Sequence, residues 1–136
     1  MTPLQIKKVF DAYIKLEWTD KSVTPVLTTS NQQPALPYIE PHVLFGGVIG
    51  LEINGYAERT GVLAINIFTR KDAGDDEGLA YGGKLEKLFW HKTLTGIVCE
   101  VGDQMPETTK IGLDEDRQAL HFQTKIPFSL IWEYTS

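Results

Sequence analysis

Residues 55–71 read Gly-Tyr-Ala-Glu-Arg-Thr-Gly-Val-Leu-Ala-Ile-Asn-Ile-Phe-Thr-Arg-Lys, and this stretch decides the fold. Within it, residues 61–69 are nearly all β-branched or large and apolar, a composition that fits a pleated strand and makes a poor helix. Only Asn66 is strongly polar inside that run. Because both alternating sets of side chains are mostly apolar, we expect a central strand with one face covered by helices and the other by a further layer or another subunit.

Helical signals precede and follow this strand. Residues 2–18 are predicted to form a helix, with Thr2 as its cap, Pro3 in its first position and Gln5 completing a capping box. A second helix is predicted over residues 77–91, after the acidic loop 72–78, whose last acids suit a first helical turn. The apolar stripes of the two helices are Ile6, Val9, Phe10, Tyr13 and Ile14, and Tyr81, Leu85, Leu88 and Phe89. The pair Gly82-Gly83 indicates close packing or a fraying start.

The remaining apolar segments are short and rich in strand-forming residues. Pro25, Pro41 and Pro127 each lie inside one of them, which predicts sheet edges or a bulge, because proline cannot donate to a strand ladder. Gly46, Gly47 and Gly50 predict a reversal or loop tip, with a hairpin arm over 48–53 and a turn at Asn54-Gly55. Residues 28–37 are expected to form a loop. The predicted strands besides the central one are 23–27, 38–45, 48–53, 96–101, 110–113 and 119–134.

The order of these elements predicts an α+β fold with a mostly antiparallel or mixed β-sheet and two α-helices packed on one face. A chain of 136 residues is expected to form a single domain, here residues 1–136. The formal charge of −5 argues against a protein that wraps nucleic acid, although not against a pore through which DNA slides. A single cysteine, Cys99, excludes an intrachain disulfide and suggests a reducing compartment. With no signal-peptide pattern and no membrane-spanning run, the sequence predicts a soluble, cytosolic protein.

Candidate chemical groups are sparse, and each has a simpler structural interpretation. Cys99 with His91 or His121 could act as nucleophile and base, but a buried inert thiol in an apolar strand is favoured. His42, His91 and His121 share no metal-ligand spacing, and the acids at 72–77 lack the calcium-loop pattern. Residues 114–116 form a plain charged turn, and Trp18, Trp90 and Trp132 are expected to cap the core. We therefore expect no catalytic residue, no cofactor and no metal.

The layout resembles that of a family of small phage proteins, the tail terminator or tail-completion proteins, including a group known as a phage-related domain of unknown function. The resemblance is spread over four segments and rests on no single diagnostic motif. These segments are Gly55…Arg59-Thr60-Gly61-Val62-Leu63…Ile65…Ile67-Phe68, then Pro37-Tyr38-Ile39…Val43, Leu85…Leu88-Phe89, and Gly112…Gln118…Phe122…Ile126-Pro127-Phe128.

This resemblance implies a structural virion protein without cofactor or reaction. Such a subunit closes into a ring, most often of six copies, caps the growing end of the tail tube, stops its polymerisation and offers the surface for head joining. The implied partners are other copies of the chain, the tail tube protein and a head–tail connector protein, with DNA only passing through the lumen and no membrane contact. The implied location is the tail of the virion, assembled in the cytoplasm of a bacterial host.

Two other functions stay open at the level of sequence. One is a neighbouring virion part, such as a head–tail connector or head-completion protein. The other is a small enzyme or ligand-binding domain, with a pocket between sheet and helices near Cys99 and His121. For self-assembly, the candidate residues lie at the ends of the long strand and in the acidic loop, namely Arg59, Arg70, Asp75, Asp76 and Glu77, since exposed loops often carry partner contacts.

Overall fold

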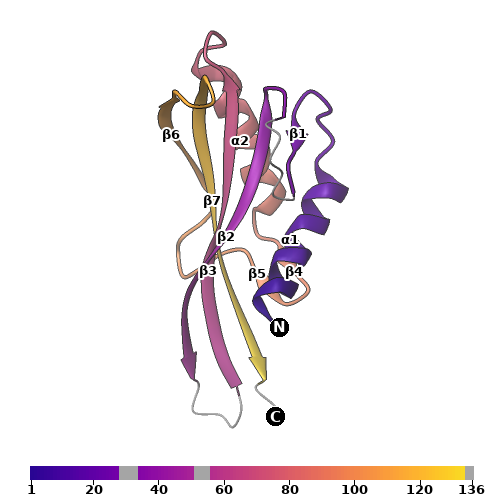
Figure 1. Cartoon of the computed structure of the whole chain (residues 1–136). Coiled ribbons are helices and arrows are strands. Elements are labelled where there is room, and N and C mark those ends of the chain that lie inside the picture. Colours follow the sequence, from indigo (N-terminus) through magenta and orange to yellow (C-terminus); the bar gives the residue numbers. More distant parts are fainter. Residues whose placement is uncertain (28–33, 51–55, 134–136) are drawn as a thin grey trace.

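The long strand β3 (Tyr56–Arg70) lies inside a seven-stranded mixed sheet with the order β1-β2-β3-β7-β5-β4, and β6 pairs with β7 beside this path (Figure 1). The structure is a computed structural model that describes residues 1–27, 34–50 and 56–133, except for the side chains of residues 132 and 133. With two helices and this sheet, the fold is α+β, as predicted. The predicted turn at Asn54-Gly55, most of the loop over 28–37 and the Trp132 side chain lie outside the described residues.

The centre of the sheet is an antiparallel ribbon of three long strands. β3 lies between β2 (Tyr38–Gly50) and β7 (Ala119–Glu133), and it pairs with β7 from Tyr56 opposite Glu133 to Arg70 opposite Ala119 without a shift in register. The only parallel pair among the described strands is β1 (Thr24–Pro25) with β2. The shorter strands on the β7 side are β4 (Thr93–Leu94), β5 (Ile97–Val98) and β6 (Glu107–Asp114).

Both helices pack on one face of this ribbon. α1 (Pro3–Glu17) and α2 (Asp75–Phe89) bury their apolar stripes against alternate side chains of the strands, among them Ile39, Ile65 and Phe122. Phe10 of α1 lies at the junction, with its ring centroid 6.2 Å from that of Phe89 and 5.2 Å from that of Phe128. The burial pattern confirms the alternation read from the sequence, since Leu63, Ile65 and Ile67 of β3 all point into this core.

The helix boundaries follow their capping residues. The Thr2 side chain accepts a hydrogen bond from the Gln5 backbone N–H, and the Gln5 side chain accepts one from the Thr2 N–H, so the predicted capping box is formed. α2 begins at Asp75, two residues earlier than predicted, because Gly74 at its N-cap adopts a φ of 74°. Three acids, Asp75, Asp76 and Glu77, therefore occupy its first turn, where the helix dipole favours negative charge.

The prediction of a reversal at Gly46, Gly47 and Gly50 is wrong. β2 continues through all three glycines, and the register with β3 shifts between Phe45 and Val48, which is a β-bulge. A Cβ on Gly46 would lie only 3.0 Å from the backbone oxygen of Thr60, so a glycine lets β2 approach β3 closely here. The glycines alone indicate a turn, but pairing with the fifteen-residue strand β3 keeps this part of β2 extended.

The proline positions agree with their predicted edge locations. Pro25 lies in the outermost strand β1, and Pro41 follows the last β2 residue that pairs with β1. Pro127 lies opposite Val62, between the β7 residues that pair with β6 and the one that pairs with β5. The other strand boundaries differ modestly from the prediction: β1 and β5 are shorter, and β6 begins three residues earlier.

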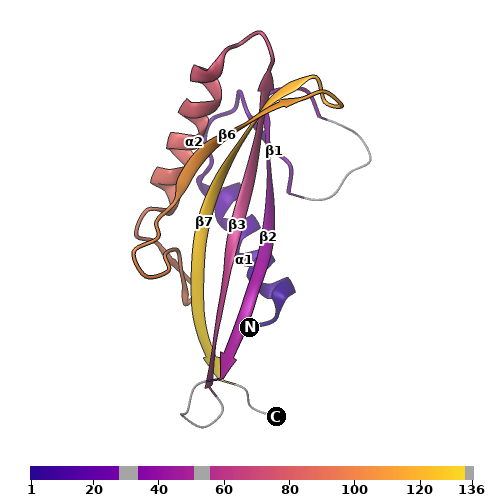
Figure 2. The same ribbon diagram turned by 90° about the vertical axis from the view of Figure 1, so that its left-hand side faces the viewer.

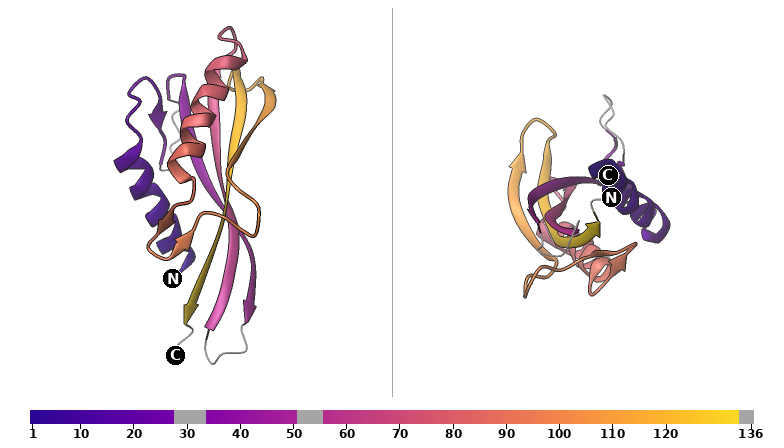
Figure 3. Two further views of the ribbon diagram at one scale, coloured as in Figure 1. Left: turned by 180° about the vertical axis from the view of Figure 1, so that it is seen from behind. Right: turned by 90° about the horizontal axis from the view of Figure 1, so that it is seen from below.

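The three long strands continue beyond the helices at one end of the molecule (Figures 1 and 2). We call this part the strand extension and define it as residues 44–50 of β2, 56–61 of β3 and 128–133 of β7. Seen from behind and from below, the helices flank the other part of the ribbon and the extension projects from it (Figure 3). The molecule is therefore elongated, with a helix-covered body and a protruding three-stranded end.

Candidate functional site

The strand extension displays large apolar side chains to solvent. Leu44, Ile49 and Ile131 are 57%, 60% and 63% exposed, and Phe45, Val48 and Tyr56 are also exposed. Ile49 and Ile131 are both register partners of Glu58, so the three residues form one row across the extension. This row points to the face opposite the helices, which we call the helix-free face and which also carries Tyr38, Phe68 and His121. Apolar side chains gathered in this way make this surface a candidate for contact with another protein.

The outer edge of β2 in the extension has only the bulge at Gly46 and Gly47 to oppose strand pairing. Residues 43–50 read Val-Leu-Phe-Gly-Gly-Val-Ile-Gly, with no charged residue and no proline. The outer edge of β6, in contrast, carries Glu107, Lys110 and Asp114, and the outermost strand β1 contains Pro25. Exposed edges normally carry such residues because their unpaired backbone groups invite another strand. The bare edge of β2 is therefore a candidate pairing site.

Of the residues predicted for self-assembly, Arg59 alone lies in the extension. Its guanidinium carbon is 5.2 Å from the centroid of the Phe45 ring, and Phe45 in turn meets Phe128 edge to face at 6.4 Å. Arg59 is partly buried, so its side chain stacks on the aromatic surface between the extension and the core instead of standing free as a charge.

The other four predicted assembly residues lie at the opposite end of the ribbon. Arg70 ends β3, eleven residues after Arg59, or roughly 36 Å away at strand spacing. Asp75 forms an ion pair of 2.8 Å with Lys110 of β6, and Glu77 accepts a hydrogen bond of 2.9 Å from the Tyr81 hydroxyl. The five predicted residues therefore belong to two separate surfaces and do not form one site.

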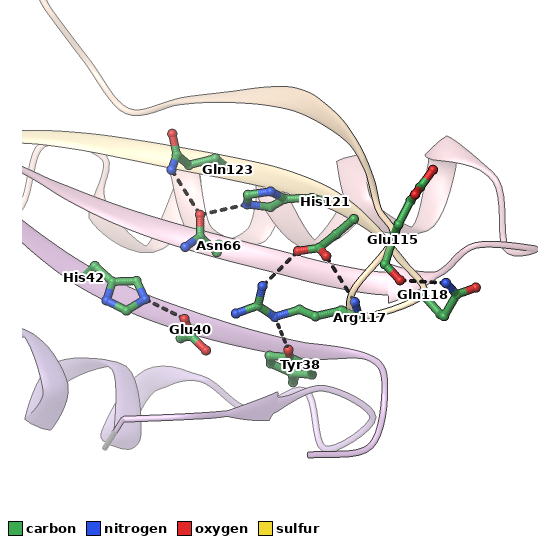
Figure 4. Close-up of polar contacts among 10 residues, drawn as sticks. Tyr38, Glu40, His42, Asn66, Glu115, Arg117, Gln118, His121 and Gln123 are labelled. Carbon is green, nitrogen blue, oxygen red and sulfur yellow. Dashed lines mark hydrogen bonds and ion pairs between the residues drawn. The ribbon is translucent and has the colours of Figure 1, made fainter. Parts of the chain in front are cut away.

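A polar and aromatic cluster, which the sequence analysis did not identify, covers the helix-free face of the body (Figure 4). The side-chain oxygen of Asn66 accepts hydrogen bonds from His121 Nε2 at 2.9 Å and from the Gln123 amide at 3.0 Å. Phe68 stacks on His121 with a centroid distance of 4.6 Å, and the Arg117 guanidinium carbon lies 4.4 Å from the Phe68 centroid. On the helix-free face of β3, where the sequence predicts a further layer or another subunit, these side chains of the same chain form the cover.

The cations and imidazoles of this cluster are engaged with their neighbours. Arg117 donates to Asp114 at 2.8 Å and to the Tyr38 hydroxyl at 3.0 Å, and the Nε2 atom of His42 is 2.6 Å from Glu40. Burial, with a smaller contribution from Arg117, lowers the pKa of His121, which favours its neutral form. The cluster therefore holds the β6–β7 hairpin against β2 and β3, and it presents no activated nucleophile.

The geometry excludes a catalytic pair of Cys99 and His121. Cys99 is fully buried in the core on the helix side of the sheet, whereas His121 stacks on Phe68 on the helix-free face. Burial raises the pKa of the Cys99 thiol to about 12, so it is protonated near neutral pH. His91, the other candidate base for Cys99, instead lies near Glu100, with 3.8 Å between its Nδ1 atom and the carboxylate.

A groove of about 640 Å³ lies between the end of α1 and α2. Lys84, Lys87 and Lys92 line it together with Glu17 and Asp20, and Lys84 and Asp20 are 2.5 Å apart. The hydrogen bond from Lys84 is the main cause that lowers the pKa of Asp20 to about 2. Lys84 is paired with Asp20 across the groove, so the two helices are joined there, and the three lysines outnumber the two carboxylates of the lining by one positive charge.

The tryptophans divide between the core and the surface. Trp18 is partly buried and donates its indole N–H to the Val23 carbonyl at 3.2 Å, as expected for a core cap. Trp90 is 46% exposed, so its predicted core position is wrong. Trp90 is the C-cap of α2, directly after the buried Phe89, and its backbone is already extended.

Among the described residues, no three His, Cys, Asp or Glu side chains lie close enough together to hold a metal ion. None of the described helices has the length and apolar character needed to cross a bilayer. The sequence does not predict the strand extension, because the glycines of β2 indicate a turn locally. The absence of charge from residues 43–50 was the signal that could have revealed it.

A scan against protein-family models found no match to this chain. A search of the curated proteins likewise found no match.

Proposed function

We propose that this protein is a structural assembly subunit that forms a ring and terminates a phage tail tube. In this role it caps the tube, stops its polymerisation and provides the surface to which the head is joined. Its partners are other copies of itself, most often six in a ring, the tube protein and a head–tail connector protein, with DNA passing through the lumen.

The observation that carries this proposal is the strand extension. It combines exposed apolar side chains with a bare strand edge, and both features stabilise contacts with protein surfaces. The polar cluster supports it indirectly, since its side chains are engaged with one another in holding the strands. The resemblance described from the sequence implies a ring-forming tail protein, and such a protein would need surfaces of this kind.

The proposal is tested in the phage that encodes the chain. Removal of its gene is expected to give tails of uncontrolled length by electron microscopy, and the wild-type gene supplied in trans is expected to restore uniform length. A Cys99→Ala variant serves as a control, because an assembly protein does not need that thiol. Normal tail lengths without the gene would contradict the proposal, and so would a label that locates the protein away from the head-proximal end of the tube.

A further inference from the structure

We propose that residues 48–50 of β2 in one copy of this chain pair with residues 130–132 of β7 in a second copy, so that the sheet continues between subunits. This inference rests on the proposed ring function and identifies the interface that builds the ring. It starts from the contrast between the edges of the sheet. The β6 edge is charged and β1 contains a proline, whereas the β2 edge in the extension is bare.

The same chain carries a second open edge on the other side of the extension. Among the described strands, β2 has its last outer partner at Ile39, and β7 has its last outer partner at Ser129. Beyond these residues, both strands have a side on which no described strand pairs. Backbone N–H and C=O groups on one such edge are satisfied by those on the other when two copies meet side by side.

The two edges also lie at the same level and present matching side chains. Ile49 and Ile131 share the partner Glu58, point to the helix-free face, and are among the most exposed apolar residues of the chain. When β7 of one copy lies beside β2 of the next, these isoleucines cover one another at the junction. The free part of β7 is short, so burial of these side chains supplies most of the stabilisation.

Strand direction determines how the copies are arranged. β2 and β7 are both antiparallel to β3, so they run parallel to each other. A second copy in the same orientation therefore adds its β7 in parallel to β2 of the first and keeps all helices on one side of the extended sheet. This contact is heterologous, because it joins two different surfaces of the chain. It closes into a ring when a whole number of rotations between neighbouring copies adds up to 360°. A β2-to-β2 dimer would leave the β7 edge of both copies open.

Disulfide trapping tests the pairing directly. Ile49→Cys and Ile131→Cys are made as separate variants, one with a size tag, and are mixed at high concentration and oxidised. The expected major product is a disulfide between the two variants, which is absent from either variant alone. Within one chain the two positions are two strand spacings apart, roughly 9.6 Å, beyond the reach of a disulfide. The buried Cys99 does not compete for oxidation.

A second pair and a control complete the test. If Ile49→Cys fails to fold by circular dichroism, Val48→Cys replaces it and is mixed with Leu130→Cys, because Val48 and Leu130 share the register partner Arg59. Thr109→Cys, on the exposed outer strand β6, is expected to give no product with Ile131→Cys. Homodimers of Ile49→Cys as the main product would show β2-to-β2 pairing and overturn the proposal, and so would no product between β2 and β7 positions.

The outcomes separate this inference from the proposed function. Uncontrolled tail length after gene removal, without the mixed disulfide, would leave the terminator function standing and overturn this interface. The mixed disulfide together with normal tails would support the interface and contradict the terminator role.

Discussion

Gly78 and Gly83 lie in the same helix but have opposite surroundings. A Cβ on Gly78 would overlap the buried ring of Phe122, whereas a Cβ on Gly83 would have no heavy atom within 4 Å. We expect Gly78→Ala to lower the free energy of unfolding by about 1–3 kcal/mol through overpacking. The matched change Gly83→Ala should raise it by up to about 1 kcal/mol, because alanine favours a helix. Urea denaturation measures both, and equal effects would show that α2 does not pack as described.

His121 gives the protein a pH-dependent stability. Burial is the main cause of its lowered pKa, Arg117 lowers it further, and Asp114 and Glu40 act in the opposite direction. The unfolded chain therefore binds more protons at this residue than the folded chain at and below about pH 6.5. The folded state should lose stability as pH falls through that region and should keep it above.

The variant His121→Gln isolates this contribution, since its amide can still donate to Asn66 but does not titrate. We expect the difference in unfolding free energy between variant and wild type to shift in favour of the variant as pH is lowered from about 7 to about 5. A difference that is constant over this range would show that His121 has an ordinary pKa.

The thiol of Cys99 should be inert in the folded protein. Its raised pKa and full burial leave almost no thiolate to react with an aromatic disulfide reagent. Labelling is therefore expected to follow the unfolding transition when urea is increased. Rapid labelling in native buffer would mean that the thiol is accessible, and would revive the nucleophile hypothesis.

At the scale of elements, the proposed interface predicts that the edge of β2 controls association. Val48 lies at the bare edge and is 44% exposed, so Val48→Lys places a charge where a strand would dock. We expect this change to abolish self-association while the free energy of unfolding stays within about 0.5 kcal/mol of wild type. Sedimentation velocity measures the first quantity and urea denaturation the second.

Thr109→Lys is the matched control, because it adds the same charge to the exposed strand β6, whose edge is already charged. It should leave association unchanged. Association that survives Val48→Lys, or is lost equally in both variants, would contradict a role for the β2 edge.

The sequence predicted elements with strong local signals. The capping box of Thr2 and Gln5 fixed the start of α1, and the β-branched run fixed β3. The bulge at Gly46 and Gly47 could not be predicted, because two glycines indicate a turn locally and only pairing with β3 keeps them extended. The polar cluster was missed for a related reason. Tyr38, Asn66 and Arg117 come from three distant segments and meet only through strand register.

At the scale of the whole molecule, charge and apolar surface occupy different ends. The end of the ribbon beyond Arg70 carries the predicted acids Asp75, Asp76 and Glu77, whereas the extension exposes mainly apolar side chains and has Glu58, Arg59 and Glu133 as its charged residues. A contact through the charged end would weaken with ionic strength, since salt screens exposed charges. We expect association through the extension to persist from about 0.05 M to about 0.5 M salt, because salt does not weaken apolar burial. Dissociation of the assembly in that range would favour the charged end as the interface.

The glycine bulge in β2 has a consequence for the size of the assembly. It lies where the helix-covered body passes into the extension, and bulged strands bend and twist more strongly than regular ones. If successive copies join through the extension, this local bend sets the angle by which each subunit is turned from its neighbour. The number of subunits in a closed circle would then depend on the geometry of two residues without side chains. A homologous chain with a bulkier residue at either position would form a circle of different diameter.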